Sequence, residues 1–595
     1  MKRYFLFCAL AFFLFNLKNE AQVLPASFQY SWQDAGLLQE FSNTPITLNI
    51  LDFGADSSGV LASDLALSNA LNTVVNTMKT IYFPEGNYLF ENTIVLKSNT
   101  IIKGAGADKT NFIFSLGGTD KHCISIEGSQ TNNISTLSSF AVKGDSTLVI
   151  SNPDSFLIGD YLKINFNDSD WVTDDWALGT VGQILKIVGK NGNHLSLNSS
   201  LRLGYALAAQ PKIRKLKMVS NLGIECLKMV RTDSSIDQTH NIFFRFAENC
   251  YVRGVSSKKS NFAHVALDNS THIEVSGCYF SDAFGFGEGG KAAGVFLTNT
   301  SNENLIQNNV FDHLRHSLLL QSGSNANVMG YNYSINAYWQ QAPLPTNAAG
   351  DLVLHGNYPY ANLFEGNICQ NIVIDNAHGK NGLHNVFFRN RAALYGIIMN
   401  NNPASDSLAF VGNEIVNPNY PYGNYILFGQ AHFQYGNNIN NNINPLGTNN
   451  LNDTSYYLQI KPAFLDGYTW PALGIPNVLN SGTIPAKERM QAQVFTTCGG
   501  NLPNAPVGVN EESVSDKNIF IFPNPSSGTL YFQNELIEEQ FLKVQVLNTL
   551  GKVVFDKIID IRLGLKLENL PNGLYLLRLK TSKGKIVLLK FVLNK

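Results

Sequence analysis

Two His-Gly pairs stand 23 residues apart in this sequence, at His355 and His378. Histidine changes its charge near neutral pH, so two such side chains on one surface suit proton transfer. Four further residues that could act as an acid, a base or a stabilising charge lie within the 88 positions that end at the second His. The candidate catalytic residues are Lys291, Arg315, His316, Asp351, His355 and His378.

Two reactions on sugar polymers suit this set. In β-elimination of a uronate-containing polymer, a His or Lys base removes the proton next to the carboxylate, an acid protonates the leaving oxygen, and a cation neutralises the carboxylate. Arg315, Lys291 or a Ca²⁺ ion could be that cation. Glycoside hydrolysis instead needs two carboxylates, and Asp351 could be one of them. The basic and His-rich character of the set favours elimination.

Three further carboxylates could serve as the hydrolytic partner of Asp351 or as oxygen ligands of Ca²⁺. These weak candidates are Asp282, Glu288 and Asp312, and no loop motif supports a calcium site. A substrate could also be held by aromatic side chains, because their faces pack against sugar rings, and by a cation beside the second His. The candidate substrate-binding residues are Trp171, Trp176, Trp339 and Lys380.

Two other interpretations stay open. His and Asp side chains at the turns between strands often only bond backbone amides of the turn. The tryptophans could be packing residues of a small domain. A secreted glycan-binding surface protein without catalysis is the second possibility, although such a protein needs no cluster of His and Arg. The nearness of the cluster to two long loops, at residues 282–294 and 337–350, favours a functional site.

A repeat in the middle of the chain would position these residues. A short apolar or alternating run followed by Gly or Asn recurs with a step of 23, interrupted by insertions of 9 and 12 residues. This strand-like period predicts an all-β fold, a right-handed parallel β-helix with one coil per repeat. Asn tolerates a left-handed turn between strands, and stacked Asn amides can bond along the coils. The repeat positions are Gly254, Gly277, Asn309, Asn332, Asn367, Asn390, Asn413 and Gly436.

The period also predicts which residues stack on neighbouring coils. His355 and His378 each lie 12 residues before a repeat position, and His316 and Asp351 each lie 16 before one. Counting back from Asn309 places a further cation, Lys291, on the coil next to that of His316. The candidates should therefore form one patch, although a slip of one residue in the register would turn a side chain inward.

An ordered set of motifs precedes the repeats. They are Asp52-Phe53-Gly54-Ala55, a helical pattern from Asp64 to Lys79, Tyr82-Phe83-Pro84-Glu85-Gly86-Asn87-Tyr88 and Ile101-Ile102-Lys103-Gly104-Ala105-Gly106. This stretch resembles the N-terminus of the pectate-lyase-superfamily β-helices, in the rhamnogalacturonase/epimerase-like group. The resemblance implies a β-helix and a carbohydrate theme, but no particular reaction, because this fold carries lyases, hydrolases and epimerases. The signatures of polygalacturonases and of the commonest pectate lyases are absent, which weakens the hydrolase interpretation.

The end of the chain has a different pattern. Short alternating runs separated by turn pairs predict a small β-sandwich. Its motifs Phe522-Pro523-Asn524-Pro525, Leu547-Asn548-Thr549-Leu550-Gly551-Lys552 and Leu570-Pro571-Asn572-Gly573-Leu574-Tyr575 resemble the C-terminal sorting domain of the type IX secretion system. The resemblance implies a Bacteroidetes-type cell, passage across the outer membrane to the exterior or the cell surface, and removal of the domain on the way.

The start of the chain has the pattern of a signal peptide: Lys2 and Arg3, an apolar run too short to span a bilayer, and Ala21 at the cleavage site. The predicted organisation is a signal peptide at 1–21, a β-helix domain at 22–500 with a β insertion at 147–205, a linker at 501–517 and a sorting domain at 518–595. A net charge of −2 over 595 residues argues against a nucleic-acid partner. The expected partners are a polysaccharide and the secretion machinery, with no transmembrane segment in the mature protein. The six cysteines that remain after cleavage are scattered, and we expect most of them to be small buried side chains.

Overall fold

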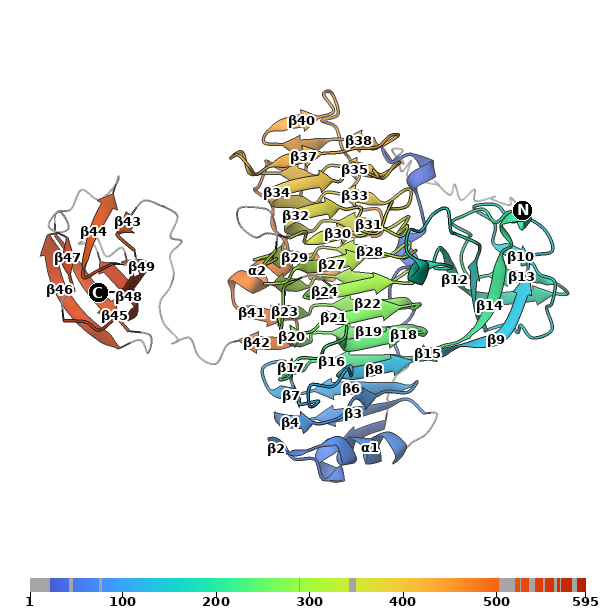
Figure 1. Cartoon of the computed structure of the whole chain (residues 1–595), viewed down its shortest axis with the longest axis horizontal. Helices are drawn as coiled ribbons and strands as arrows, with labels where there is room; N and C mark the ends of the chain where they lie inside the picture. Colours follow the sequence, from blue (N-terminus) through green and yellow to red (C-terminus); the bar gives the residue numbers. More distant parts are fainter. Residues whose placement is uncertain are drawn as a thin grey trace, which may run out of the picture. The chain divides into compact units, whose positions relative to one another are not determined.

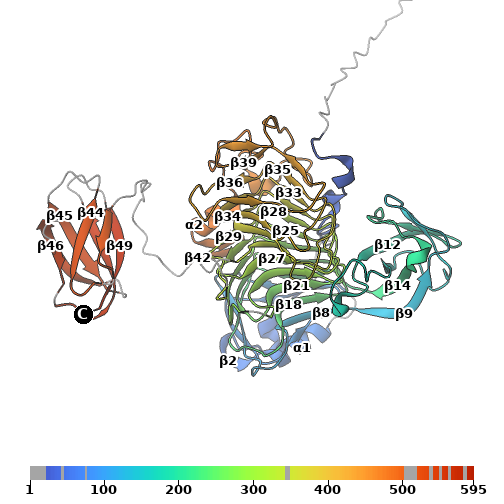
Figure 2. The same cartoon turned by 45° about the horizontal axis from the view of Figure 1, so that its top comes forward.

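The computed structural model describes residues 22–594, except 42–45, 74–76, 288, 342–348, 502–518, 525, 535–540, 549–551, 561–563, 568 and 581–585. The predicted signal peptide and nearly all of the predicted linker lie outside the described residues. The chain divides into two compact units, Met1–Asn504 and Ala505–Lys595. Figures 1 and 2 show the first unit as a parallel β-helix with a smaller sheet beside it. The predicted fold class is therefore confirmed.

The coils of the β-helix supply two large sheets, whose strands pair in parallel except for β39 with β40. Among the described residues, one sheet has thirteen strands: β1 (Ile46–Asn49), β3 (Lys79–Phe83), β6 (Thr100–Gly104), β15 (Val219–Ser220), β16 (Leu222–Glu225), β19 (Ala247–Arg253), β22 (Thr271–Ser276), β25 (Leu305–Gln307), β28 (Val328–Gly330), β31 (Leu363–Glu365), β33 (Val386–Phe388), β35 (Ala409–Val411) and β38 (Phe433–Tyr435).

The described part of the other sheet has 21 strands: β2 (Ser58–Ala62), β4 (Gly86–Phe90), β5 (Ile94–Val95), β7 (Thr110–Phe114), β8 (Ile124–Glu127), β17 (Lys228–Arg231), β18 (His240–Arg245), β20 (Ser256–Ser260), β21 (Ala263–Asp268), β23 (Tyr279–Ala283), β24 (Ala293–Thr298), β26 (Val310–Asp312), β27 (His316–Leu320), β29 (Tyr333–Ile335), β30 (Leu352–Leu354), β32 (Ile368–Ile374), β34 (Arg391–Met399), β36 (Glu414–Ile415), β37 (Asn424–Ile426), β39 (Asn437–Ile439) and β40 (Asn442–Asn444). Apolar side chains fill the space inside the coils. The rings of Phe364, Phe387 and Phe410 stack there with centroids 4.7 and 5.2 Å apart.

Asn side chains stack along the coils, as the period predicted. From Asn309 to Asn437, each Asn donates its backbone N–H and its side-chain amide to Oδ1 of the Asn on the next coil, at 2.8–3.1 Å. A second stack of the same kind, which the sequence analysis missed, runs from Asn304 to Asn385. Both stacks satisfy backbone amides where the strands turn, inside the β-helix.

The predicted link between the stacked Asn and the left-handed turn is wrong by one residue. The residue with positive φ precedes each stacked side chain, as Asn308 does at 54° and Gly366 at 69°. Gly254, Gly277 and Gly436 are therefore turn residues and not equivalents of Asn309. The turn residue reverses the chain, which directs the next side chain inward to bond the neighbouring coil.

Replacing Asn390 with Ala is expected to lower the free energy of unfolding by about 2–4 kcal/mol, because several buried hydrogen-bonding groups lose their partner. Asn390 is fully buried, accepts from Asn367 and donates to the Phe364 carbonyl and to Asn413. Urea unfolding measures the change. The control, Asn401→Ala on the exposed surface, is expected to shift stability by less than about 0.5 kcal/mol. Equal effects of the two substitutions would contradict this account of the stack.

The smaller sheet is antiparallel, with strands β9 (Ser129–Thr136), β10 (Thr147–Val149), β11 (Tyr161–Asn165), β12 (Gly182–Asn191), β13 (His194–Leu197) and β14 (Lys212–Lys217). We call it the insertion sheet. It is wider than the insertion expected at 147–205, because β9 and β14 pair in it as well. The buried Arg202 fixes this sheet to the β-helix through an ion pair with Glu303 and a 2.9 Å hydrogen bond to Asn325.

The N-terminal end of the β-helix is covered by α1 (Asp64–Thr73), which buries Ala66, Leu67 and Ala70 against the core (Figure 1). The chain after the last coil carries α2 (Pro485–Gln491), β41 (Val494–Thr496) and β42 (Gly499–Asn501). A disulfide joins Cys226 to Cys498, and the other four cysteines of the described chain are buried thiols. The bridge ties the returning segment to the wall of the β-helix.

The second unit has a three-stranded sheet of β43 (Ile519–Phe522), β44 (Thr529–Asn534) and β47 (Leu565–Lys566), and a four-stranded sheet of β45 (Phe541–Leu547), β46 (Val553–Asp560), β48 (Gly573–Lys580) and β49 (Ile586–Leu593). Both sheets are antiparallel and share one apolar core. Within the described ranges, no helix combines the length and the apolar character needed to cross a membrane.

Candidate functional site

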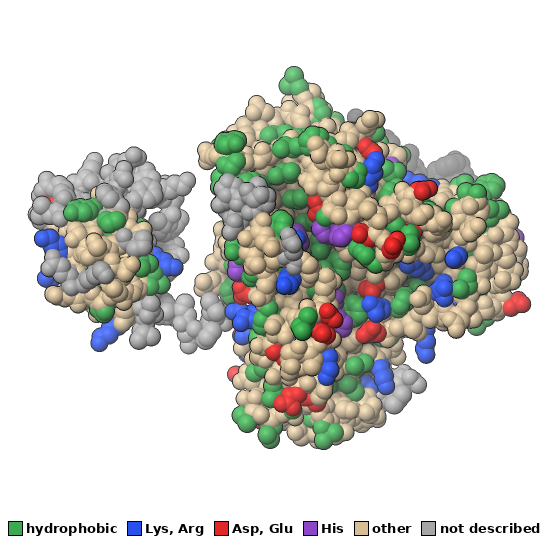
Figure 3. All heavy atoms as spheres, viewed as in Figure 1, with side chains coloured by type: hydrophobic (Ala, Val, Ile, Leu, Met, Phe, Trp, Pro, Cys, Tyr) green, Lys and Arg blue, Asp and Glu red, His purple; other side chains and the backbone are tan. Residues whose placement is uncertain are grey.

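A cleft of about 840 Å³ lies on the face of the β-helix that borders the insertion sheet. Its floor comes from β18, β21, β24 and β27. Its walls come from the segments that precede β18, β24 and β27, from those that follow β29, β30 and β32, and from the segment around Trp176. Figure 3 shows His side chains gathered on this face. The cleft brings together five of the six predicted catalytic residues: Lys291, Arg315, His316, His355 and His378.

One His in the cleft is held by a partly buried carboxylate. Leu354 pairs with Ile374 in the sheet, which places His355 beside Asp375 on the next coil. His355 Nδ1 lies 2.6 Å from Asp375 Oδ2. Burial raises the pKa of Asp375, but the charge of His355, its hydrogen bond and the Ala377 N–H together lower that pKa overall. The ionised carboxylate therefore keeps a proton on Nδ1 of His355 and leaves Nε2 as the proton acceptor.

The second His is held in the same way, by a carboxylate from the insertion sheet side. His378 Nδ1 lies 2.8 Å from Asp174 Oδ2, which also accepts from Asn357 Nδ2 at 2.9 Å. The rings of His355 and His378 lie with centroids 5.0 Å apart, as the predicted stacking required. Side-chain exposure is 17% for His355 and 31% for His378. Two His–Asp pairs thus stand side by side, one deeper than the other.

Positive charge enters the cleft through Lys291 and Arg315. The Arg315 guanidinium donates to the Gly287 carbonyl at 2.8 Å and lies over the Trp339 ring, 4.6 Å from its centroid. Within the described chain, the buried Trp339 Nε1 has no hydrogen-bond partner. This fixed guanidinium is suited to hold a carboxylate of a ligand.

His316 lines the cleft in its neutral form. Its Nδ1 donates to the Gly350 carbonyl at 2.9 Å, and its ring centroid lies 6.0 Å from that of His355. Burial, with the charges of Arg315 and His355, lowers the pKa of His316 to about 3. A neutral imidazole of such low basicity is a poor acid or base near neutral pH. His316 therefore packs beside His355 and presents its Nε2 as a hydrogen-bond acceptor.

Asp351 leaves the predicted patch. Leu318 pairs with Leu352, so Ser317 and not His316 lies opposite Asp351. This slip of one residue turns the carboxylate inward, where it is fully buried and accepts from Ser334 Oγ and from the backbone of Asn371 at 2.7 Å. Burial raises the pKa of Asp351 to about 6, although its hydrogen bonds oppose the rise. Asp351 therefore serves as the acceptor for buried hydrogen-bond donors.

The predicted substrate-binding residues separate into two groups. Trp339 and Trp176 line the cleft, and the half-exposed Trp176 meets the His378 ring edge-on at 5.4 Å. Trp171 and Lys380 lie in another groove, where Trp171 packs 4.5 Å from Tyr358 and Lys380 pairs with Asp406 at 3.4 Å. The structure therefore does not bring Trp171 and Lys380 to the cleft.

Two of the weak metal candidates, Asp282 and Asp312, bond to other side chains. Asp282 Oδ1 lies 3.0 Å from His313 Nδ1, and Asp312 accepts from Tyr279 and Asn336. Glu288 lies outside the described residues. In the part of the chain that the structure describes, no group of three or more His, Cys, Asp or Glu side chains could hold a metal ion. A role for Ca²⁺ stays a prediction.

The other half of the cleft consists of residues that were not predicted from the sequence. Phe243, Phe262 and Phe296 line it together with His122 and His240, whose rings stack at 5.1 Å. Burial lowers the pKa of His122 to about 4 and holds that of His240 well below its usual value, so both rings are neutral near pH 7. His240 and Phe243 come from β18 and Phe296 from β24, whereas Phe262 and His122 precede β21 and β8. The strand register aligns His240 with His316 through Ala263 and Ala293, and this alignment could have indicated this half of the cleft. The five side chains form an aromatic wall suited to the face of a sugar ring.

Comparisons with known proteins agree with this architecture. Residues 47–155 match the model of the family described as rhamnogalacturonase A/epimerase, pectate lyase-like. Residues 520–594 match the secretion system C-terminal sorting domain, which indicates a secreted protein. No curated protein sequence matches the chain.

Solved structures of parallel β-helix proteins are similar to the chain at low identity. The tailspike protein gp49 from Pseudomonas phage LKA1 is 16% identical, with a TM-score of 0.47, over 62% of this chain and 64% of the tailspike, which is less than two thirds of the tailspike. The gp54 tailspike of Acinetobacter baumannii bacteriophage AP22, in complex with a capsular saccharide, is 12% identical, with a TM-score of 0.32, over 66% and 77% of the two chains.

The Azotobacter vinelandii mannuronan C-5 epimerase AlgE6 A-module is also 12% identical, with a TM-score of 0.26, over 65% of this chain and 98% of that module. The chain thus joins a parallel β-helix, whose first part matches the pectate-lyase-like rhamnogalacturonase A/epimerase model, to a C-terminal secretion sorting domain.

Proposed function

We propose that this chain is a secreted polysaccharide lyase that cleaves a uronate-containing polymer by β-elimination. The observation that carries the proposal is the cleft, in which two His–Asp pairs share one surface with Arg315 and Lys291. The sorting-domain match supports export by the type IX secretion machinery of a Bacteroidetes-type cell, where extracellular or surface-bound polysaccharide is the accessible substrate.

Each step of the reaction has a side chain to perform it. Arg315 and Lys291 bind the uronate carboxylate and stabilise the charge that grows on it as the neighbouring proton leaves. His355 Nε2 takes the proton from C5, and the electron pair of that C–H bond forms the C4=C5 double bond. The C4–O bond breaks, and His378 gives a proton to the leaving oxygen. We assign the base to His355 because it is the less exposed of the two and is held by the less exposed carboxylate.

The carboxylates of the cleft argue against the hydrolase alternative. Hydrolysis needs a free acid and a second free carboxylate across the glycosidic bond. Of the carboxylates in the described part of the cleft, Asp268 accepts from Arg245 at 2.8 Å, and also from Asn269 and Asn299. Asp174 and Asp375 are bound to the two His side chains. With its carboxylates engaged in this way, the cleft suits base-catalysed elimination better than hydrolysis.

The alternative of a non-catalytic glycan-binding protein fits the aromatic wall of the cleft but does not use its two His–Asp pairs. A binding surface needs neither a shielded base nor an acid beside it. A lyase changes the polymer chemically and a binding protein does not, so the formation of product distinguishes the two functions.

The expected result with a panel of uronate polysaccharides is a rise in ultraviolet absorbance, because the new C4=C5 double bond is conjugated with the carboxylate. The assay uses the purified full chain, with Ca²⁺ and with a chelator, and the responsive polymer identifies the substrate. New reducing ends without a rise in absorbance would show that the chain hydrolyses the polymer and does not cleave it by elimination. Binding without either signal would make the chain a glycan-binding protein.

A further inference from the structure

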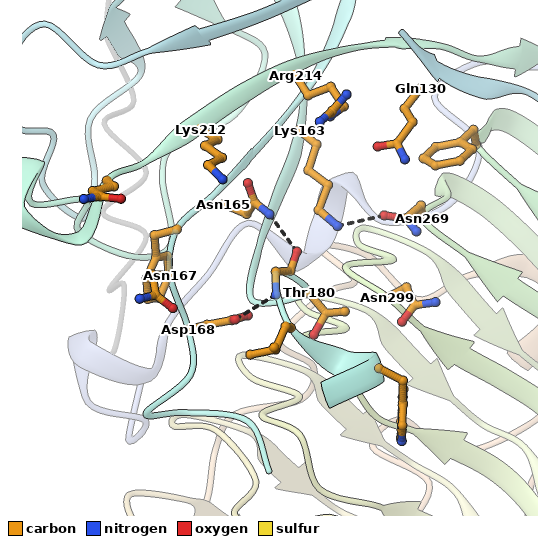
Figure 4. A pocket seen from close by; sticks show the side chains of 16 residues that line it. Gln130, Lys163, Asn165, Asn167, Asp168, Thr180, Lys212, Arg214, Asn269 and Asn299 are labelled. Carbon is orange, nitrogen blue, oxygen red and sulfur yellow. Dashed lines mark hydrogen bonds between the residues drawn. The ribbon is translucent and has the colours of Figure 1, made fainter. Parts of the chain in front are cut away.

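A second cavity adjoins the cleft, between the insertion sheet and the β-helix. Its volume is about 690 Å³, and Trp176 and Asn299 line both spaces. Figure 4 shows its walls, with Lys163 from β11 and Lys212 and Arg214 from β14. We call this second cavity the cationic pocket. A polymer that passes over Trp176 from the cleft would enter it.

Three cations line the cationic pocket without a direct carboxylate partner in the described chain. Within the described residues, Lys163, Lys212 and Arg214 form no ion pair. Lys163 donates to Asn269 Oδ1 at 3.0 Å, and Arg214 donates to the Thr131 carbonyl at 2.9 Å. Both partners are neutral, so no carboxylate bonds directly to Lys163 or Arg214 among the described residues.

The carboxylate of Asp168, which also lines the pocket, is already engaged. Its two oxygens accept the backbone N–H groups of Gly179 at 2.7 Å and Val181 at 2.9 Å. These bonds shape the loop that carries Trp176. They leave Asp168 directed at the backbone of its own loop, so it does not pair with the three cations.

This arrangement of positive charges destabilises the fold when no anion is bound. Lys163 lies directly opposite Arg214 in the register of β11 and β14, and like charges at opposed positions destabilise a sheet. Burial lowers the pKa of Lys163 to about 8, although Asp268 and Asp168 oppose the shift. An anion bound between these side chains would relieve both costs. Gln130, Asn269 and Asn299 add neutral amides that could bond sugar hydroxyls.

We propose that the cationic pocket binds a second acidic sugar of the same polymer, through a carboxylate or a sulfate group. This inference rests on the proposed function, since it takes the polymer in the cleft to continue past Trp176. The exposed indole, edge-on to His378, separates the sugar at the reacting bond from the sugar in the pocket. The protein then requires acidic groups on at least two sugars of its substrate, one beside Arg315 and one beside Lys163.

Calorimetric binding of acidic tetrasaccharides tests the proposal, using the full chain with His355→Asn so that the ligand is not consumed. Lys212→Gln and Arg214→Gln are each expected to weaken binding about tenfold, because each removes a charge-assisted hydrogen bond. Lys217→Gln, at an exposed position of the same strand outside the pocket, is the matched control and should bind as the parent does. Tetramers of uronate, of a sulfated sugar and of neutral glucose distinguish the anion.

The outcomes separate this proposal from the proposed function. Unchanged affinity in the two pocket variants, or equal affinity for the neutral tetramer, would contradict the proposal that the cationic pocket binds an acidic sugar. Neither result would contradict elimination in the cleft. Weakened binding in those variants, together with the absence of cleavage by the unmodified chain, would support the pocket and reject the lyase. Lys163→Gln serves as a further variant, and its melting temperature shows whether any loss comes from folding.

Discussion

Replacing His355 with Asn is expected to lower the rate of polymer cleavage by at least about 100-fold, which is the contribution typical of a general base. Asn retains an N–H donor close to the position of Nδ1, so Asp375 keeps a partner. It offers no basic atom where Nε2 was, and the C5 proton then has no acceptor. The same hydrogen bond should keep the melting temperature within about 2 °C of the parent. Initial rates of absorbance change and thermal unfolding measure the two quantities.

The chain offers a matched control for this substitution. His313 also pairs its Nδ1 with a carboxylate, Asp282 at 3.0 Å, but it does not line the cleft. His313→Asn should therefore leave the cleavage rate within about twofold of the parent, as expected for a surface change. Asp375→Asn should lower kcat and shift the pH profile, because it loosens the tautomer of His355. A loss of activity in proportion to a large loss of stability would assign His355 a structural role instead.

The sequence period predicted the fold because it is a local property that each coil repeats. Every coil must turn at the same place and bury the same face, so the spacing of Gly and Asn records the geometry directly. Insertions between repeats change the spacing, so the position of the next strand can no longer be counted from it. The loop before Asp351 shifts the register by one residue, and the count from Asn367 could not detect the shift. His355 and His378 lie beyond the loop, and their rings come within 5.0 Å as the spacing predicted, although the strands that precede them pair at a shorter step than the repeat.

The carboxylates that hold these two His residues were not predictable in the same way. Asp375 lies 20 residues after His355, a spacing shorter than the repeat, because β30 follows the long loop and pairs early with β32. Asp174 lies 204 residues before His378, in a part of the chain with no period. Its position depends on the docking of the insertion sheet onto the coils. Three-dimensional packing of a separate element leaves no spacing in the sequence from which such a contact could be inferred.

Replacing Arg315 with Gln is expected to lower kcat by about 100-fold to 1,000-fold, the range found when a donor to a developing negative charge is removed. The guanidinium is held over Trp339 and fixed by the Gly287 carbonyl, so it needs no rearrangement as charge builds on the substrate carboxylate. Its contribution grows toward the transition state, so kcat should fall more than KM rises. Steady-state rates on the responsive polymer separate these two parameters.

Arg315→Lys distinguishes charge from geometry at this position. A Lys ammonium keeps the charge but loses the planar, two-donor contact, and it should recover only part of the rate. Arg245 is the control, since it lines the same cleft and forms an ion pair with Asp268 at 2.8 Å. Arg245→Gln should change kcat by less than about tenfold, as expected for a partly exposed ion pair. If Arg245→Gln instead lost as much activity as Arg315→Gln, the carboxylate would bind at the other end of the cleft, and the roles assigned to Arg315 and His355 would both be wrong.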